Sequence, residues 1–514
     1  MDLSKADNII TENDSLAPLL QPQYLGIKLS LLSMQSCVTL TTVRKLADTS
    51  NLLVSKGLSS STQSRRLVNA AAYYTSCLKG NLKSVESLEK RVQGISDLKR
   101  PPKQKTNPLQ RGIADFLTTH LQPSVLTQDD LSLEKLVPAL PKRYTIYEPM
   151  LSLPLNAFTH PPAWDTLYSS LANEQRQALY VCIANAFARF GVTHIAMNAP
   201  IVPLNAQGRE NRMRSPVGLV PIYGDFGAPV SGDGESAQPS ETDYEQAFWV
   251  RTVQNHGIVQ IWAPLYTMFS RGNVTEKARI LGHGSRFEGL DGKTLAEGEI
   301  GDVAVVDMYA GIGYFVFSYL KRGVKRVWGW EINGWSVEGL RRGCVKNGWG
   351  CRVVRVSKDG KVSTPIPELV ESLGDADRVV VFHGDNRFAA DVMGKIRAIM
   401  EAQEEWTSIR HVNLGLLPSS SSSWNNACKI IDERKGGWAH VHENVDVQKI
   451  DEKKHEITAS IGRSWAESIS QFTTMQPSTE CRHVEQVKTY APGVMHCVFD
   501  LWLSSDIGGS ESTR

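Results

Sequence analysis

One segment, Val305–Phe315, constrains the fold of this chain more than any other. It reads Val-Val-Asp-Met-Tyr-Ala-Gly-Ile-Gly-Tyr-Phe, so an apolar strand ends in an acid, turns through two glycines and enters a helix. Glycines such as Gly311 and Gly313 let the backbone approach a ligand closely because no Cβ intervenes, and the following helix start offers free N–H groups. The segment therefore predicts a strand–turn–helix unit that binds a nucleoside cofactor next to Asp307.

A second acid, Glu331, ends the next apolar segment, about twenty residues further on. A carboxylate at the tip of a second strand can accept hydrogen bonds from the two hydroxyls of a ribose. A dinucleotide fingerprint would place a third glycine where Val316 stands, so the match to NAD is poor. The Asp-x-x-x-Gly-x-Gly form is typical of S-adenosylmethionine proteins and predicts that cofactor, with an ordinary strand–turn–helix junction as the alternative.

Strand-like segments alternate with helical ones over residues 301–505. The strand-like segments are Val303–Tyr309, Arg326–Glu331, Arg378–His383, His411–Leu416 and Trp438–Asn444. This alternation predicts an α/β fold with a mostly parallel sheet and crossover helices. We therefore expect a Rossmann-like, class I S-adenosylmethionine-dependent methyltransferase fold here, with an insertion at Lys358–Asp377 before the third of these strands.

The ends of the chain differ in character from this region. Residues 1–125 are predicted to form a partly helical extension, near whose end lies the basic, proline-containing segment Lys99–Lys105. This segment indicates a solvent-exposed linker, with an RNA-contacting arm as the alternative. Residues 506–514 are polar and predict a flexible tail.

Residues 126–300 are predicted to form an additional N-terminal α/β domain. A helix is expected over Tyr180–Phe190, ended by Gly191, and a short strand follows at His194–Met197. The Gly-, Ser- and Pro-rich stretch at 227–243 predicts a loop or a disordered insertion.

Composition restricts the function only weakly. The chain has 56 Lys and Arg residues against 54 Asp and Glu, so its net charge of +2 does not by itself indicate nucleic-acid binding. Its eight cysteines include no Cys-x-x-Cys pair, which predicts reduced thiols and no zinc site. The sequence lacks a secretory pattern and an apolar run of the ~18 residues that span a bilayer, so we expect a cytoplasmic protein without membrane contact.

Two further polar segments follow strands of the predicted sheet. After the third strand, Asp385 and Asn386 have side chains that can hydrogen-bond an adenine edge, although the same residues suit an ordinary turn. After the fourth strand, Asn413–Ser420 lacks the Asn-Pro-Pro-aromatic form found in many amine methyltransferases. This difference favours a transfer other than simple N-methylation.

Two candidate contacts lie outside this sheet or at its far strand. Ser270 and Lys277 are seven residues apart, about two helical turns, and could together hold a carboxylate such as that of methionine. The alternative is a helix start with surface charges. On the fifth strand, His440 and His442 lie on one face, which suits a structural role better than a metal site.

Together these segments resemble, in the same order, the tRNA wybutosine-synthesizing protein 2 family. The resembling segments are Tyr266–Lys277, Asp307–Phe315, Trp330–Asn333, Gly384–Arg387, Asn413–Ser420, His440–Val445 and Val487–Val494. Leu140–Tyr144 and Gly224–Gly227 are similar to the N-terminal domain of the family, so the resemblance spans roughly Leu140 to Leu503. A departure is Gly334, which stands where a proline is common.

The resemblance implies a specific reaction. The family transfers the 3-amino-3-carboxypropyl group of S-adenosylmethionine to C7 of 4-demethylwyosine at position 37 of phenylalanine tRNA, and releases methylthioadenosine. By the same resemblance Ser270 and Lys277 contact the cofactor, Glu331 holds its ribose, and Asp385 and Asn386 hold its adenosine end. No residue identifies itself as a general base. The alternatives are a tRNA guanosine-37 N1-methyltransferase and a non-catalytic RNA-binding protein with the same fold.

Overall fold

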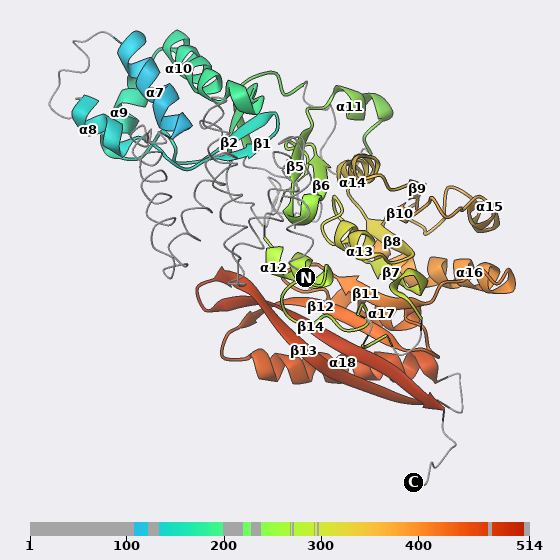
Figure 1. The fold of residues 1–514 in the computed structure, drawn as a ribbon. Helices are drawn as coiled ribbons and strands as arrows, with labels where there is room; N and C mark the ends of the chain where they lie inside the picture. The colour runs from blue at the N-terminus through green and yellow to red at the C-terminus, as the bar shows by residue number, and fades with distance from the viewer. Residues whose placement is uncertain are drawn as a thin grey trace, which may run out of the picture. The chain divides into compact units, whose positions relative to one another are not determined.

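The chain divides into two units, Met1–Thr106 and Asn107–Arg514, and all of the described residues lie in the second. The computed structural model describes residues 107–121, 133–198, 219–227, 238–267, 269, 272–291, 293–295, 298–470 and 475–507 (Figure 1). The predicted linker Lys99–Lys105 and most of the predicted loop at 227–243 lie outside these ranges. Within them, no helix is long and apolar enough to cross a membrane.

An eight-stranded sheet in the order β13-β14-β12-β11-β7-β8-β10-β9 organises the C-terminal part of the chain. Its strands are β7 (Ala304–Asp307), β8 (Arg326–Glu331), β9 (Cys351–Arg355), β10 (Val379–His383), β11 (Ile409–Leu414), β12 (Gly437–Asp446), β13 (Met475–Ala491) and β14 (Val494–Ile507). The six strands from β12 to β9 are parallel, and β14 and β13 add antiparallel pairs at one edge. The predicted Rossmann-like, mostly parallel sheet is therefore confirmed.

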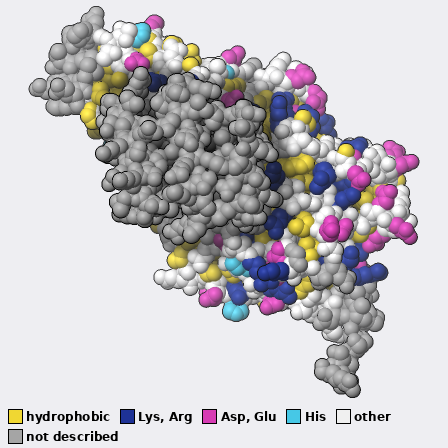
Figure 2. Space-filling model, viewed as in Figure 1, with side chains coloured by type: hydrophobic (Ala, Val, Ile, Leu, Met, Phe, Trp, Pro, Cys, Tyr) yellow, Lys and Arg dark blue, Asp and Glu magenta, His cyan; other side chains and the backbone are white. Residues whose placement is uncertain are grey.

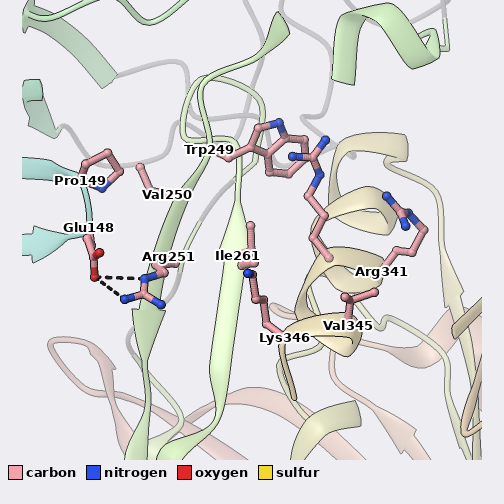
Figure 3. Close-up of a pocket in the computed structure, with 10 residues that line it drawn as sticks. Glu148, Pro149, Trp249, Val250, Arg251, Ile261, Arg341, Val345 and Lys346 are labelled. Atoms are coloured by element: carbon pink, nitrogen blue, oxygen red, sulfur yellow. Dashed lines mark hydrogen bonds and ion pairs between the residues drawn. The ribbon is translucent and has the colours of Figure 1, made fainter. Parts of the chain in front are cut away.

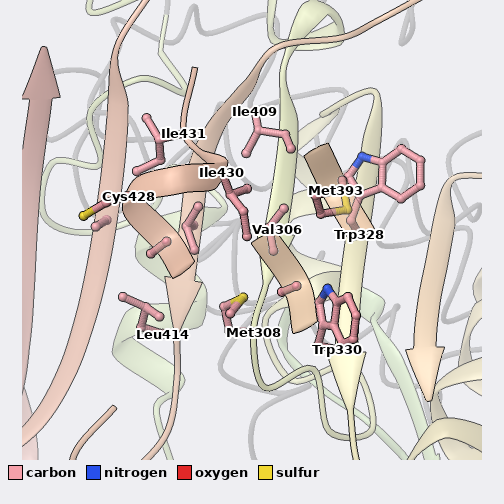
Figure 4. Packing of buried hydrophobic residues seen from close by; sticks show 14 of the residues in the cluster. Val306, Met308, Trp328, Trp330, Met393, Ile409, Leu414, Cys428, Ile430 and Ile431 are labelled. Atoms are coloured by element: carbon pink, nitrogen blue, oxygen red, sulfur yellow. The ribbon is translucent and has the colours of Figure 1, made fainter. Parts of the chain in front are cut away.

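Helices cover both faces of this sheet. One face carries α13 (Val316–Arg322) and α14 (Gly334–Asn347), and the other carries α15 (Ile366–Glu371), α16 (Ala389–Ala402), α17 (Trp424–Ile430) and α18 (Ile450–Ile469). Neighbouring residues of β7 point to opposite faces, so Val305 packs with α13 and α14 while Val306 packs with α16 and α17. Figure 4 shows the second of these cores, in which Trp328 lies beside Met393 and Trp330 belongs to the same cluster. Burial on both faces explains the continuous apolar runs of the central strands.

Three elements of the sheet domain differ from the sequence prediction. The strand β9 lies at the sheet edge, and its sequence Cys-Arg-Val-Val-Arg does not alternate between apolar and charged residues, so it carries little strand signal. Helix α15 lies inside the predicted insertion Lys358–Asp377 and buries Leu369 and Val370. The hairpin of β13 and β14 was not predicted, and it extends to Ile507, into the expected flexible tail.

A four-stranded sheet in the order β1-β2-β3-β4 forms the predicted N-terminal α/β domain. Its strands are β1 (Thr145–Tyr147), β2 (Met150–Pro154), β3 (His194–Asn198) and β4 (Leu219–Tyr223), and its helices are α7 (Pro108–Thr119), α8 (Leu133–Ala139), α9 (Pro162–Ser170) and α10 (Asn173–Ala186). The strand predicted at His194–Met197 is β3, and the helix predicted at Tyr180–Phe190 ends as α10 and a 3-10 turn before Gly191.

Helix α7 belongs to this domain. The guanidinium of Arg111 donates a hydrogen bond of 2.9 Å to the carbonyl of Ala186 on α10. Gly112 brings the two helices so close that a Cβ there would lie 2.8 Å from the α10 backbone. The apolar face of α7 needs this partner, so the domain begins near Asn107, whereas the sequence suggested residue 126 as its start.

A hairpin and two short helices connect the sheets. These elements are α11 (Glu241–Gln246), β5 (Val250–Val253), β6 (Val259–Trp262) and α12 (Val274–Ile280), and a 3-10 turn at Asn255–Gly257 joins β5 to β6. Further 3-10 turns lie in the sheet domain at Ile300–Asp302, Asn386–Phe388 and Ser421–Ser423. Ser240 and Asp243 form a capping box at the start of α11, so the predicted loop ends before Ser240.

The hairpin packs against helix α14. The side-chain amide of Asn347 donates to the carbonyl of Val259 at 2.8 Å and its oxygen accepts from the Val259 N–H at 2.9 Å. At Gly339 a Cβ would lie 2.7 Å from the carbonyl oxygen of Ile261. The missing side chain at Gly339 therefore lets β6 lie directly on α14.

Candidate functional site

The carboxyl ends of the central strands bring the predicted site residues to one edge of the sheet. In the strand register Asp307 of β7 lies beside Asn413 of β11, and Glu331 of β8 lies beside His383 of β10. The strand order reverses between β7 and β11. Open α/β sheets bind ligands in the crevice at such a switch point, so this edge is the candidate cofactor site.

The glycine turn after β7 is fixed by the acid at the tip of β8. The N–H of Gly311 donates to one oxygen of the Glu331 carboxylate at 2.8 Å, and the N–H of Asn333 donates to the other at 2.8 Å. Gly311 has φ 54° and Gly313 has φ 88°, both in the left-handed region that favours glycine. Glu331 is thus oriented at the strand tip where the sequence places a ribose contact.

Asp307 lies beneath this turn. Its side chain is fully buried, and its Oδ1 accepts hydrogen bonds of 3.1 Å from Asn413 Nδ2 and from the Tyr309 N–H. Burial raises the pKa of Asp307 to about 7, and the nearby charge of Glu331 adds to this shift. Asp307 therefore holds the ends of β7 and β11 together from inside the domain.

Asp385 and Asn386 form the turn that follows β10. Asp385 Oδ1 accepts from the Arg387 N–H at 3.0 Å and so caps the 3-10 turn, as the turn interpretation of the sequence predicted. The side-chain amide of Asn386 donates to the carbonyl of Met308 at 2.7 Å. This bond ties the turn to the end of β7, so both residues belong to the candidate site.

Ser423, which the sequence did not single out, also contacts Asn386. The Ser423 hydroxyl is 2.6 Å from the Tyr309 hydroxyl and donates to Asn386 Oδ1 at 3.4 Å. Ser423 lies at the start of α17, in a run of serines whose sequence gives no indication which one faces the site.

Lys277 is a buried cation beside the glycine turn. Its side chain is only 8% exposed, and its Nζ has no hydrogen-bond partner among the described residues. The Nζ lies 5.2 Å from the ring centre of Tyr314, the residue after Gly313. Burial and, to a smaller extent, the positive charge of Lys488 together lower the pKa of Lys277 to about 8. Ser270, its predicted companion, lies outside the described residues.

Lys488 is a second cation that the sequence did not single out. It lies on β13, opposite His496 of β14, and burial lowers its pKa. Strand β13 contacts helix α12, which carries Lys277. The two lysines come from segments far apart in the sequence, so only the fold brings them together.

The two histidines of β12 belong to buried polar networks. His440 Nδ1 lies 2.6 Å from Asp500, which also binds Arg279, and His440 Nε2 lies 2.9 Å from His411. His442 Nδ1 lies 3.1 Å from His496. In the described parts of the chain, no group of three or more His, Cys, Asp or Glu side chains is arranged to hold a metal ion. Both histidines therefore connect β12 to its neighbours.

The loop after β11 is held by the next strand. Glu443 accepts a hydrogen bond from the Ser419 hydroxyl at 2.8 Å and from the Ser420 N–H at 3.1 Å. Burial raises the pKa of Glu443. This anchoring gives the Asn413–Ser420 segment a defined path beside the candidate site.

Comparison with known proteins gives close relatives in sequence. No family model matches the chain. The tRNA wybutosine-synthesizing protein 2 of Schizosaccharomyces pombe is 39% identical over 365 residues, which cover 70% of this chain and 72% of that protein. The protein of the same name from Saccharomyces cerevisiae is 29% identical, and the match covers 76% of this chain and 80% of the yeast protein.

Among solved structures, P. horikoshii TYW2 in complex with MeSAdo is 18% identical, with a TM-score of 0.42 over 77% of this chain and 98% of that chain. Trm5b from Pyrococcus abyssi is 15% identical, with a TM-score of 0.40 over 72% of this chain and 78% of that chain. The identity to the S. pombe protein extends over most of both chains. This chain therefore belongs to the tRNA wybutosine-synthesizing protein 2 family.

Proposed function

We propose that this chain modifies position 37 of phenylalanine tRNA, where it attaches the 3-amino-3-carboxypropyl group of S-adenosylmethionine to C7 of 4-demethylwyosine. As a member of its family, the chain is an S-adenosylmethionine-dependent aminocarboxypropyltransferase of wybutosine synthesis. The N1-methyltransferase and non-catalytic alternatives are not favoured, because both relatives carry the wybutosine name. The compartment we propose is the cytoplasm, where the six cysteines of the described residues would stay free thiols.

The observation that carries the site assignment is the buried ammonium of Lys277. An ammonium taken out of water without a hydrogen-bond partner is costly unless an anion compensates it. Within the described parts of the chain no carboxylate pairs with this ammonium, and Lys488 adds positive charge nearby. We assign these two lysines to the carboxylate of the methionine arm of S-adenosylmethionine.

The nucleoside end of S-adenosylmethionine fits the other side of the glycine turn. Glu331 stands at the tip of β8 with both carboxylate oxygens oriented by backbone N–H groups, which suits the ribose hydroxyls. Asp385 and Asn386, fixed at the end of β10, suit the adenosine. Gly311 and Gly313 allow the left-handed backbone of the turn that joins these two ends.

Placing the two ends of S-adenosylmethionine decides which group moves. The sulfonium has three carbon neighbours, and only the carbon held in line with the nucleophile reacts fast. In the proposed step C7 of the base bonds to the γ-carbon of the methionine arm. The bond between that carbon and sulfur breaks, and its electron pair stays on sulfur in methylthioadenosine. The base then loses the C7 proton to water, since none of the described residues of the site is identified as its acceptor.

One experiment separates this reaction from methylation. The full-length chain is incubated with tRNA that bears 4-demethylwyosine and with S-adenosylmethionine labelled in the methionine carboxyl. We expect label in the tRNA and methylthioadenosine as the by-product. Unlabelled, methylated tRNA with adenosylhomocysteine as the by-product would identify a methyltransferase instead.

A further inference from the structure

We infer that a basic groove beside helix α14 binds the phosphate backbone of the tRNA substrate. This inference rests on the proposed function and names a surface that the chemistry at the sheet edge does not use. The groove is a cavity of about 440 Å³ between the β1–β2 turn, the hairpin of β5 and β6, and α14 (Figure 3). Its lining residues are Glu148, Pro149, Trp249, Val250, Arg251, Ile261, Arg341, Arg342, Val345 and Lys346.

Positive charge exceeds negative charge in this groove. Its cations are Arg251, Arg341, Arg342 and Lys346. Two carboxylates neutralise part of this charge. Glu148 pairs with Arg251 at 2.7 Å, and Glu338 pairs with both Arg341 and Arg342. Lys346 is exposed and makes no ion pair within the described part of the chain. The whole chain is nearly neutral, so this excess is a local feature that attracts an anionic partner.

The arginines are held in place before any ligand binds. Glu338 accepts hydrogen bonds of 2.7 and 2.8 Å from Arg341 and of 2.7 Å from Arg342. Arg342 also donates to the carbonyl of Tyr244 at 3.0 Å, and its guanidinium lies 4.2 Å from the ring centre of Trp249. A guanidinium has five N–H donors, so Arg341 keeps donors for a phosphate.

The groove also offers apolar and aromatic surface. Trp249 is half-buried, and Val345 is 63% exposed between the cations of α14. Figure 2 shows Lys and Arg side chains among hydrophobic ones on the face that includes α14. Cations next to aromatic rings are typical of surfaces that bind single-stranded RNA, because phosphates and bases are contacted together.

The groove leads toward the cofactor edge of the sheet. Helix α14 starts at Gly334, three residues after Glu331. Arg341 and Lys346 lie seven and twelve residues further, so they stand about 10 and 18 Å along the helix axis. RNA that lies in the groove would therefore continue to the edge where Glu331 stands.

Aromatic packing joins the two places directly. Trp335 stacks on Tyr266 with ring centres 4.0 Å apart, and its ring centre lies 6.1 Å from that of Trp249. The side-chain amide of Asn333 donates to the carbonyl of Tyr266 at 3.4 Å. The aromatic cluster of Trp249, Trp335 and Tyr266 therefore packs against both the groove and the region around Glu331.

The test compares loss of positive charge inside and outside the groove. We measure the Kd of a fluorescein-labelled phenylalanine tRNA transcript by anisotropy at several salt concentrations for wild type, Lys346→Glu and Arg341→Gln. Each variant is expected to raise the Kd about fivefold or more and to reduce the slope of log Kd against log salt by about one. Affinity for S-adenosylmethionine should not change.

Lys429→Glu is the matched control. Lys429 is exposed on α17, which covers the opposite face of the sheet, and its reversal should change the tRNA Kd less than twofold. Equal tRNA affinities for Lys346→Glu and Lys429→Glu would overturn the assignment of the groove. Failure of the wild type to transfer the carboxyl label would instead contradict the proposed function, independently of tRNA binding.

A kinetic readout separates RNA binding from a structural role. In single-turnover transfer with the groove variants, the tRNA concentration for half-maximal rate should rise about fivefold, while the rate at saturating tRNA stays near wild type. Thermal unfolding of each variant checks that the fold is intact. A lower rate at saturating tRNA with an unchanged half-saturating concentration would also overturn the assignment.

Discussion

The backbone N–H of Gly311 donates a hydrogen bond of 2.8 Å to the carboxylate of Glu331. This bond crosses from the turn after β7 to the tip of β8, so the glycine turn and the proposed ribose contact form one unit. A substitution of either residue should therefore change the position of the other.

Glu331→Ala should weaken the binding of S-adenosylmethionine. Two charge-assisted hydrogen bonds of roughly 1.5–3 kcal/mol each would be lost and partly replaced by water. A net loss of about 2 kcal/mol raises the Kd about 30-fold, which calorimetric titration can measure. Glu331→Gln keeps an acceptor for one backbone N–H and should show a smaller loss. A Kd for the alanine variant equal to that of wild type would remove Glu331 from the site.

Gly313→Ala should destabilise the protein and disturb the turn. Gly313 has φ 88°, and a Cβ there would lie 2.6 Å from the ring of Phe317. Strain of this kind should lower the free energy of unfolding by about 1–3 kcal/mol, which chemical denaturation measures. Gly394→Ala is the matched control, because Gly394 lies in α16 with open space around it, and the change should stabilise by about 0.5–1 kcal/mol. The same effect for both substitutions would contradict the steric argument.

Lys277→Met should reduce transfer far more than it reduces binding of methylthioadenosine, which lacks the methionine carboxylate. The Lys277 side chain is nearly fully buried, so methionine fills its space without the charge. We expect a fall in single-turnover transfer of at least 10-fold and a change of less than threefold in the Kd of methylthioadenosine. Wild-type transfer by this variant would contradict the assignment of Lys277 to the methionine carboxylate.

Asp307→Asn should alter the pH dependence of stability. The pKa of Asp307 rises from 3.8 to about 7 on folding, so the folded protein holds the proton to higher pH than the unfolded chain. The stability that the neutral carboxyl contributes is full below pH 3.8 and is lost as pH rises through about 7. The free energy of unfolding of wild type minus that of the variant should fall by about 2–4 kcal/mol between pH 4 and pH 8.

The control for this prediction is Asp375→Asn. Asp375 is exposed, and its partner Lys325 lowers its pKa. The free energy of unfolding of wild type minus that of Asp375→Asn should therefore rise slightly with pH. Chemical denaturation at both pH values measures each variant. A difference for Asp307→Asn that does not change with pH would show that its carboxyl titrates normally.

Arg279→Met should destabilise the fold strongly. The guanidinium is fully buried and pairs with Glu276 at 2.7 Å and with Asp500 at 2.5 Å. Among the described residues, removing the guanidinium leaves Glu276 without its partner and Asp500 with only His440, which costs about 3–5 kcal/mol. Lys325→Met breaks the exposed pair with Asp375 and should change stability by less than about 1 kcal/mol. Equal losses in urea denaturation would contradict the role of burial.

The sequence by itself determined the elements whose signals are local. The turn from Asp307 to Gly313 depends on a buried strand followed by residues that accept left-handed backbone, and both properties are written in adjacent residues. The same holds for Glu331 at the end of an apolar strand and for the turn at Asp385 and Asn386. Parallel pairing of such strands follows from their alternation with helices, so the edge that holds these residues was predictable.

Only the tertiary structure decided which distant segments meet. The two edge strands of the sheet, β9 and β13, carry weak alternation, because an edge strand can keep polar residues on both faces. Lys488 lies near Lys277 only after β13 packs against α12, and the groove beside α14 needs the β1–β2 turn and the β5–β6 hairpin. Burial and charge at these places depend on partners remote in the chain, and local residue patterns carry no information about such partners.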